Sequence, residues 1–257
     1  MPLHRPYTIH ESISNERAHF LTDETVAALG ATHVALATLT EQLAPSLQDR
    51  RYSAVVTDSL PGTLPAFVVN HLTYRWAAHK RVASPQPLSL KAVLEDPGCI
   101  GLQPRGREAR ALLVTDVVRE SATGLTCERL KQSFPDVDVA GLQTYWNDPG
   151  YYHRYWEQHN LPLQDTRIFP GLQGSDHGTL LQAPVLELAS GYEPAVKPGP
   201  DDETSGAETP PITRYEAQLG AVTTHEHQLI MDVARDHLVG IAMDLYAVHF
   251  PPFREEE

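Results

Sequence analysis

Residues 111–126 read ALLVTDVVRESATGLT. The apolar, β-branched beginning predicts a buried strand, and the small and hydroxyl residues after it predict a loop that leads into a helix over 125–134. Asp116 then lies at the carboxyl end of the strand, just before a loop whose amides, together with the helix N-terminus, can hold an anion. The segment therefore predicts an α/β protein with a phosphate-binding site at a strand end.

Short apolar runs of the same kind occur on both sides of this segment. A short β-branched run from residue 52 leads to Asp58 and a Pro-Gly turn, and a helix is expected over 65–79; another strand is expected over 137–145. Strand–loop–helix units of this size predict a parallel sheet with helices on its faces. In open α/β sheets ligands bind at the carboxyl ends of the strands, where both Asp58 and Asp116 are expected.

We expect three parts along the chain: a helical N-terminal element over 1–50, a core over 51–145, and a C-terminal extension over 146–257. In the first part Gly30 and Pro45 interrupt the apolar pattern, which favours two short helices over one long helix.

The C-terminal extension contains two distinct segments. Residues 194–211 are rich in Pro, Gly and acids and poor in apolar groups, which predicts an exposed linker. An amphipathic helix is expected over 225–248. Its apolar face can dock on the core of its own chain or pair with a second copy in a homodimer.

Composition narrows the class of protein. The 257 residues are 41% hydrophobic and 21% charged, which is ordinary for a folded protein, and the net charge of −13 disfavours nucleic acid and anionic membranes as partners. No apolar run is long enough to cross a bilayer, and the N-terminus has no apolar signal core. The two cysteines fit neither a disulfide framework nor a metal spacing. We therefore expect a cytoplasmic protein.

Residues 111–126 resemble the phosphoribosyl-pyrophosphate (PRPP) loop of the type I phosphoribosyltransferases, in which apolar residues precede two acids, an apolar pair and a small-residue turn ending in Ser or Thr. Asp116 matches the second acid, residues 117–118 match the apolar pair, and Thr123 matches the final hydroxyl. Thr115 replaces the first acid, and Glu120 stands where a small residue is usual. The resemblance implies a parallel-sheet core with a helical N-terminal element and a C-terminal hood.

The resemblance also implies a PRPP site. The 5′-phosphate and ribose would contact Thr115, Asp116, Arg119, Glu120, Ser121, Ala122, Thr123 and Gly124. The pyrophosphate would contact a loop made of Asp58, Ser59, Leu60, Pro61, Gly62 and Thr63. Asp116, which would also bind Mg²⁺, is the expected catalytic residue together with Lys80 and Arg105. Residues 88–110 match the long flexible loop that closes over the reaction in this family.

Aromatic residues are concentrated directly after the expected core. Tyr145 and Trp146 lie where they could stack on a planar acceptor, although an ordinary packing cluster between the core and the extension explains the same pattern.

The implied function is that of a pentosyl glycosyltransferase of nucleotide metabolism. Such an enzyme moves the phosphoribosyl group of PRPP to a nitrogenous base or a related small-molecule acceptor and releases pyrophosphate, with Mg²⁺ as cofactor. The substitutions at Thr115 and Glu120 leave a second function open, a catalytically silent relative that serves as a ligand sensor or interaction module. A hydrolase or another enzyme on an unrelated α/β sheet is the third alternative.

Overall fold

A parallel β-sheet lies at the centre of the molecule. The computed structural model describes residues 23–49, 52–58, 63–95, 110–146, 148–173 and 238–250. Its strands are β1 (Ala54–Thr57), β2 (Gln86–Ser89), β3 (Arg110–Val118), β4 (Asp136–Thr144) and β5 (Ile168–Gln173). They form one five-stranded sheet in the order β2-β1-β3-β4-β5, and every neighbouring pair is parallel. The expected α/β class with a parallel sheet is confirmed.

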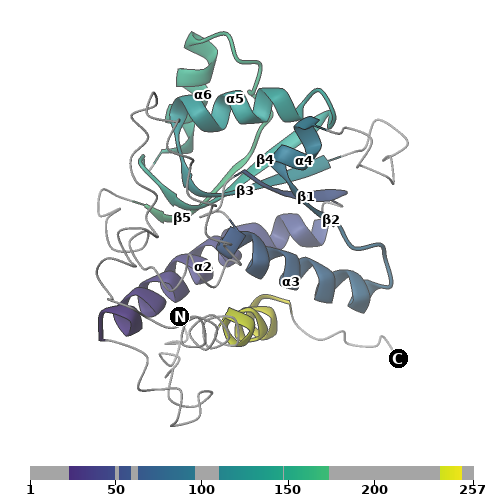
Figure 1. Cartoon of the computed structure of the whole chain (residues 1–257), viewed down its shortest axis with the longest axis vertical. Helices are drawn as coiled ribbons and strands as arrows, with labels where there is room; N and C mark the ends of the chain where they lie inside the picture. The colour runs from purple at the N-terminus through teal and green to yellow at the C-terminus, as the bar shows by residue number, and fades with distance from the viewer. Residues whose placement is uncertain are drawn as a thin grey trace, which may run out of the picture.

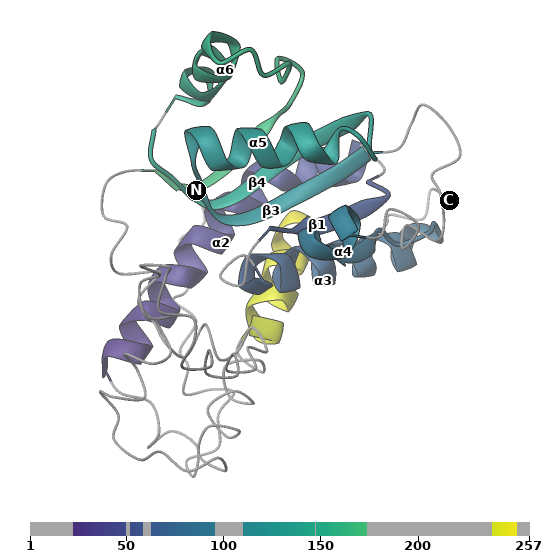
Figure 2. The ribbon, with the colours of Figure 1, turned by 45° about the horizontal axis from the view of Figure 1, so that its top comes forward.

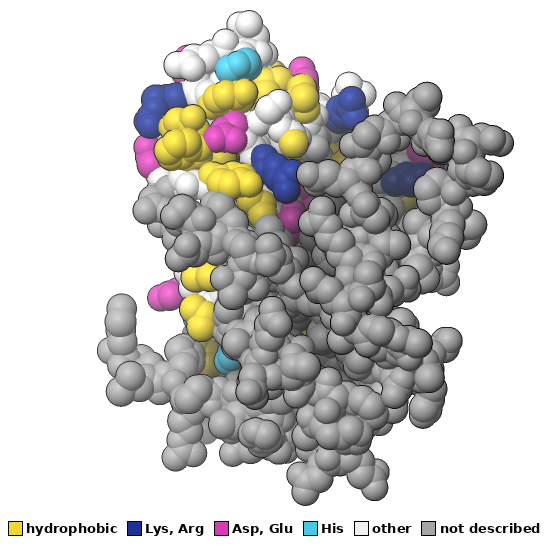
Figure 3. Space-filling view, turned by 60° about the vertical axis from the view of Figure 1, so that its left-hand side comes forward, with side chains coloured by type: hydrophobic (Ala, Val, Ile, Leu, Met, Phe, Trp, Pro, Cys, Tyr) yellow, Lys and Arg dark blue, Asp and Glu magenta, His cyan; other side chains and the backbone are white. Residues whose placement is uncertain are grey.

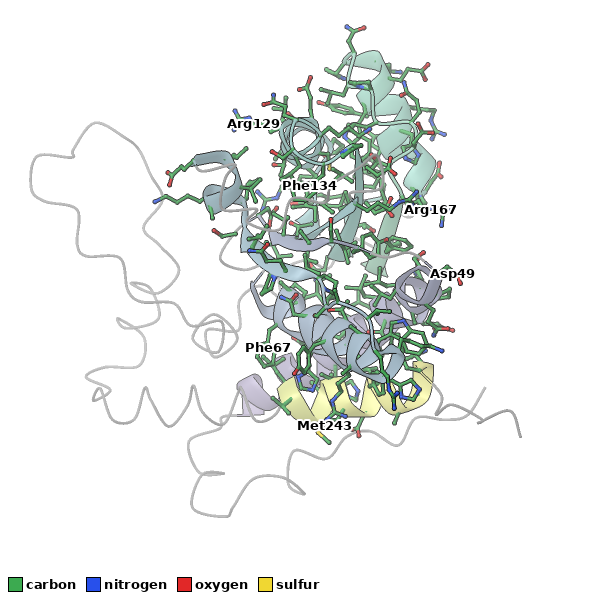
Figure 4. All side chains as sticks on the ribbon, turned by 90° about the vertical axis from the view of Figure 1, so that its right-hand side faces the viewer. Asp49, Phe67, Arg129, Phe134, Arg167 and Met243 are labelled. Atoms are coloured by element: carbon green, nitrogen blue, oxygen red, sulfur yellow. The ribbon has the colours of Figure 1, made fainter. Side chains whose placement is uncertain are left out.

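Helices cover both faces of the sheet. The helices are α2 (Asp23–Asp49), α3 (Thr63–Lys80), α4 (Leu90–Glu95), α5 (Glu120–Leu130), α6 (Pro149–Gln158) and a C-terminal helix over 238–249. Figure 1 shows α4, α5 and α6 on one face, and α2, α3 and the C-terminal helix, drawn in yellow, on the other. Figure 2 shows α5 and α6 in the same arrangement from a tilted view. Figure 4 shows the same layers edge-on, with Arg129 of α5 above the strands and Phe67 of α3 and Met243 below them.

Each face has its own hydrophobic core. Below the sheet, Leu39 of α2, Leu72 of α3 and Leu112 of β3 belong to one buried cluster. Above it, Leu113 of β3 and Val139 of β4 pack with Phe134 in a second cluster. Leu112 and Leu113 point to opposite faces because successive strand residues alternate. Because β3 is central and buried on both faces, its sequence begins with the unbroken apolar run ALLV.

The N-terminal element contains one long helix, contrary to the prediction of two. Helix α2 runs for 27 residues and passes through both Gly30 and Pro45. Pro45 is exposed, so its ring faces away from the core, while the buried side chains of Leu39, Leu43 and Leu47 hold the helix against the sheet. Tertiary packing of this apolar face outweighs the local cost of the two helix-breaking residues.

Helix α5 begins five residues earlier than expected. Its first residue is Glu120, so residues 120–124 form helical turns rather than an extended loop. The strand before it ends at Val118, and only Arg119 separates the two elements. This short junction brings the N-terminus of α5 directly to the end of β3.

Both edge strands contain a proline. Pro87 lies in β2 and Pro170 lies in β5, and neither strand was predicted from the sequence. Proline cannot donate a ladder hydrogen bond, so it is found in edge strands rather than central ones. Residues 86–95, which fall largely in the expected flexible loop, therefore form a strand and the short helix α4, whereas 96–109 lie outside the described residues.

The C-terminal helix docks on the core of its own chain. Leu238, Ile241 and Leu245 are buried in the cluster below the sheet, which is the first of the two arrangements predicted for this apolar face. The expected linker over 194–211 and the part of the expected helix before 238 lie outside the described residues. Among the helices that are described, none has the length and apolar character needed to span a membrane.

Candidate functional site

The strand order reverses at the β1–β3 pair: the chain passes from β1 outward to β2 on one side, and later from β3 outward to β4 on the other. Helix α3, which follows β1, packs in the lower core, whereas α5, which follows β3, packs in the upper core. The two connections therefore leave the adjacent carboxyl ends of β1 and β3 toward opposite faces. The N–H of Asp58 donates to the carbonyl of Val114 at 3.5 Å, which keeps the end of β1 beside β3. The strand ends beside such a switch point are the usual ligand site of an open α/β sheet.

Asp116 lies in β3, two residues before the strand ends at Val118. Its side chain is 8% exposed, and its Oδ1 accepts a hydrogen bond from the Thr115 hydroxyl at 3.2 Å. The same hydroxyl also lies 3.2 Å from the carbonyl oxygen of Val117. Thr115 is fully buried, so its hydroxyl orients Asp116, and the predicted direct contact between Thr115 and ribose is not supported by this arrangement.

The N-terminus of α5 adjoins Asp116 and is closed by Thr123. The N–H of Arg119 donates to the Thr123 hydroxyl at 2.9 Å, and the N–H of Thr123 donates to the Arg119 carbonyl at 3.1 Å. Thr123 is buried, so its side chain caps the helix instead of facing a ligand. The backbone N–H groups of residues 120–122 have no hydrogen-bond acceptor within the helix, because the helix begins at Glu120. Together with the positive end of the helix dipole, they can bind an anion.

Glu120 is held by two tryptophans. Its carboxylate accepts a hydrogen bond from the indole N–H of Trp146, and its backbone carbonyl accepts one from the indole N–H of Trp156 at 2.6 Å. The carboxylate is thereby fixed toward the end of β4. It remains a negative charge in the first turn of α5, where it opposes anion binding electrostatically.

A glycine allows α6 to approach α5 this closely. A Cβ atom on Gly124 would lie 2.5 Å from the indole nitrogen of Trp156 and 2.9 Å from Leu161. Gly124, which was predicted to contact phosphate, is buried one turn into the helix. Its lack of a side chain serves the packing between the two helices.

The aromatic residues after β4 divide into two groups. Tyr152 and Trp156 of α6 are fully buried, as the packing alternative predicted. Tyr145 and Trp146 are 42% and 45% exposed, and the Trp146 ring lies 4.4 Å from that of Tyr151 between centroids. At the height of α5 and α6, Figure 3 shows hydrophobic side chains gathered beside acidic and basic ones. Tyr145 and Trp146 are therefore the exposed members of this aromatic cluster.

A groove of about 620 Å³ lies at the carboxyl ends of β1 and β2. It is lined by Thr57, Asp58, Ala66, Phe67, Asn70, Pro87, Leu88, Ser89, Leu90 and Lys91. Lys91 is the second residue after β2, and its ammonium nitrogen lies 3.9 Å from the carboxylate of Glu95 in the same helix. Asn70, Ser89 and Lys91 are polar groups at this edge that were not predicted, because β2 itself could not be predicted from the sequence.

Lys80 does not lie at this edge. Helix α3 carries the chain back across the sheet, so Lys80, its last residue, lies near the beginning of β2 at the amino edge. Its ammonium nitrogen is 4.6 Å from the centre of the Trp76 ring. The predicted contact of Lys80 with pyrophosphate is therefore not supported. Arg105 and residues 59–62 lie outside the described residues, and Thr63 is the first residue of α3.

The fold and the groove together define an open α/β protein with a parallel sheet and polar groups at its carboxyl edge. Comparisons with protein-family models, with curated proteins and with solved structures find no match to this chain. Within the described ranges no three His, Cys, Asp or Glu side chains are grouped to hold a metal ion. The case for function accordingly rests on the residues of the site.

Proposed function

We propose that the protein is a phosphoribosyltransferase of the type I class, which binds PRPP at the carboxyl edge and transfers its phosphoribosyl group to a nitrogenous acceptor. One observation carries this proposal. A carboxylate near the end of a central strand, Asp116, is followed after three residues by the N-terminus of α5, beside the switch point between β1 and β3. A carboxylate suits sugar hydroxyls and a helix N-terminus suits a phosphate, which are the two parts of a ribose 5-phosphate.

In this proposal the parts of PRPP are divided among three elements. The 5′-phosphate binds the amides of residues 120–122, and the ribose hydroxyls bind the carboxylate of Asp116. The pyrophosphate occupies the groove beside Asp58, where Lys91 supplies the positive charge that was first assigned to Lys80. Asn70 and Ser89, which line the same groove, add hydrogen-bond donors.

The donor set of this edge suits Mg²⁺. Magnesium is commonly held by one or two carboxylates together with substrate phosphates and water, and Asp116 and Asp58 lie on adjacent strand ends. When bound, the ion neutralises the charge of the leaving pyrophosphate. It also offsets the repulsion between the phosphates and the three carboxylates of Asp58, Asp116 and Glu120.

The reaction needs positioning and charge neutralisation more than covalent catalysis. The bond between the anomeric carbon and pyrophosphate breaks, and a bond from that carbon to the acceptor nitrogen forms. Asp116 fixes the ribose, the amides of α5 fix the phosphate, and Lys91 neutralises negative charge that develops on the pyrophosphate. The exposed rings of Tyr145 and Trp146 provide a stacking surface for a planar acceptor beside α5.

Calorimetry with PRPP and Mg²⁺ tests the binding part of the proposal. Asp116→Asn should weaken PRPP affinity by about tenfold or more, because a charged hydrogen-bond partner of the ribose is lost. Asp165→Asn makes the same chemical change at an exposed position near the opposite edge and should have no effect. Equal affinity in wild type and folded Asp116→Asn would refute the assignment. Release of pyrophosphate in a screen of nitrogenous bases then tests turnover.

A silent relative that senses PRPP is the second candidate, and Glu120 favours it. Its carboxylate occupies the first turn of α5, where it lowers the affinity for a phosphate. PRPP binding without pyrophosphate release for any base would support this candidate over the enzyme.

A further inference from the structure

A second cavity lies at the amino edge of the sheet, away from the groove at the carboxyl edge. It has a volume of about 260 Å³ and is bounded by the ends of α2 and α3 and the segments that enter β1 and β2. Its lining residues are Leu47, Gln48, Tyr52, Thr73, Trp76, Ala77, Lys80, Val82, Ala83 and Pro85. The volume is slightly below the roughly 300 Å³ at which small-molecule sites begin, so a single-ring ligand is the size that suits it.

Two aromatic side chains contribute to the walls of this cavity. The hydroxyl of Tyr52 donates to the buried carboxylate of Asp138 at 2.8 Å, so its hydrogen-bonding group is engaged inside the protein and its ring is what remains for a ligand. The ring of Trp76 packs against Phe250, with 5.5 Å between centroids. Both side chains are thus held in place by contacts within the protein, which preorganises the cavity for a flat apolar group.

The polar side of the cavity is positively charged. Lys80 is the charged side chain among the described residues that line it, and its ammonium nitrogen lies 4.6 Å above the Trp76 ring centre. The surrounding sequence from 59 to 94 contains no Asp or Glu, although the whole chain carries a net charge of −13. The cavity therefore combines aromatic walls with a local cation in a protein that is acidic overall.

We propose that this cavity binds a small aromatic carboxylate. The ring would lie against Tyr52 and Trp76, and the carboxylate would pair with Lys80 at the rim. A single negative charge fits better than a phosphate, because Lys80 is the one cation among the described lining residues and the carbonyls at the C-terminal end of α3 repel additional negative charge. The proposal is independent of PRPP binding, since the two sites share no residue and lie at opposite edges.

Titration of the full chain with benzoate tests this site, with neutral benzamide as the matched ligand. Benzoate should bind with a Kd below about 1 mM and shift the indole N–H resonance of Trp76, assigned from a Trp76→Phe variant. Lys80→Gln should weaken benzoate by about tenfold and leave the weaker binding of benzamide unchanged. Lys80 is exposed, so the substitution preserves the fold.

Arg81→Gln provides the control for non-specific charge effects. Arg81 is the adjacent cation but does not line the cavity, and its loss should change benzoate affinity by less than about twofold. An equal loss in the Arg81 and Lys80 variants would overturn the proposal, because attraction to the basic surface would then explain binding. No benzoate binding at about 10 mM, or binding without a change at Trp76, would overturn it as well.

Discussion

The hydroxyl of Tyr152 donates a hydrogen bond to the carbonyl of Val118, the last residue of β3, at 3.2 Å. The same oxygen accepts the N–H of Tyr145 at 3.0 Å and lies 3.3 Å from the N–H of Trp146. One phenol of α6 therefore joins the end of the strand that carries Asp116 to the exposed aromatic pair after β4. The relative position of these two strand ends therefore depends on one buried side chain that bonds to both.

Tyr152→Phe should lower the free energy of unfolding by about 1–3 kcal/mol, because it leaves a carbonyl and two amides of the strand ends without this partner. Urea denaturation measures the loss. Tyr155→Phe removes a hydroxyl from a half-buried tyrosine of the same helix and should change stability by less than about 0.5 kcal/mol. Equal stability of the Tyr152 variant and wild type would show that the three contacts contribute nothing.

Gly124→Ala should destabilise the protein by about 1–3 kcal/mol, because the new methyl group would overlap the indole of Trp156 and force α5 and α6 apart. Gly150→Ala is the matched substitution in the first turn of α6. There a Cβ meets the flexible side chains of Asp148 and Arg154, and alanine favours the helix, so stability should be unchanged or rise by up to about 1 kcal/mol. Thermal unfolding measures both changes. A larger loss of stability in Gly150→Ala than in Gly124→Ala would contradict this account.

Stability should fall at alkaline pH because of Cys127. Burial raises the pKa of its thiol to about 12, from an ordinary value of 9.0. The folded state holds the proton more tightly than the unfolded state, so this contribution is complete below pH 9 and is lost as the pH rises from there toward 12. Urea unfolding at several pH values should show a shallower alkaline decline in Cys127→Ala than in wild type. Identical slopes would exclude the thiol as the cause.

Glu120→Gln should strengthen binding of PRPP with Mg²⁺ by about two- to fivefold, because it removes a negative charge from the first turn of α5 and retains a side-chain oxygen for Trp146. Calorimetry measures the change. Glu128→Gln removes an exposed charge near the other end of α5 and should have little effect. A weaker complex in the Glu120 variant would place the phosphate away from this helix.

The central part of the fold could be predicted from the sequence because its strands have strong local patterns. The apolar run at the start of β3 and the β-branched run of β1 indicate parallel strands without any tertiary information. The edge strands β2 and β5 have no such pattern, since each is short and contains a proline. Their pairing depends on the neighbouring strand rather than on their own residues.

The candidate site could be predicted in part for a similar reason. The position of Asp116 follows from its own strand. The helix that ends at Lys80 was expected to end at 79, but its direction across the sheet, which carries Lys80 to the amino edge, could not be predicted from local sequence. Thr123 has the hydroxyl expected of a phosphate ligand, but it caps α5 because that helix begins at Glu120. One helix boundary thus changed the roles of several residues.

The prolines at the two borders of the sheet restrict how copies of this chain can associate. Pro87 and Pro170 interrupt the row of N–H donors along β2 and β5, so a sixth strand from another copy would meet a gap in the ladder at either border. A continuous intermolecular sheet is therefore disfavoured. Among the described elements, the helical layers are therefore the surfaces that remain for contact between two copies.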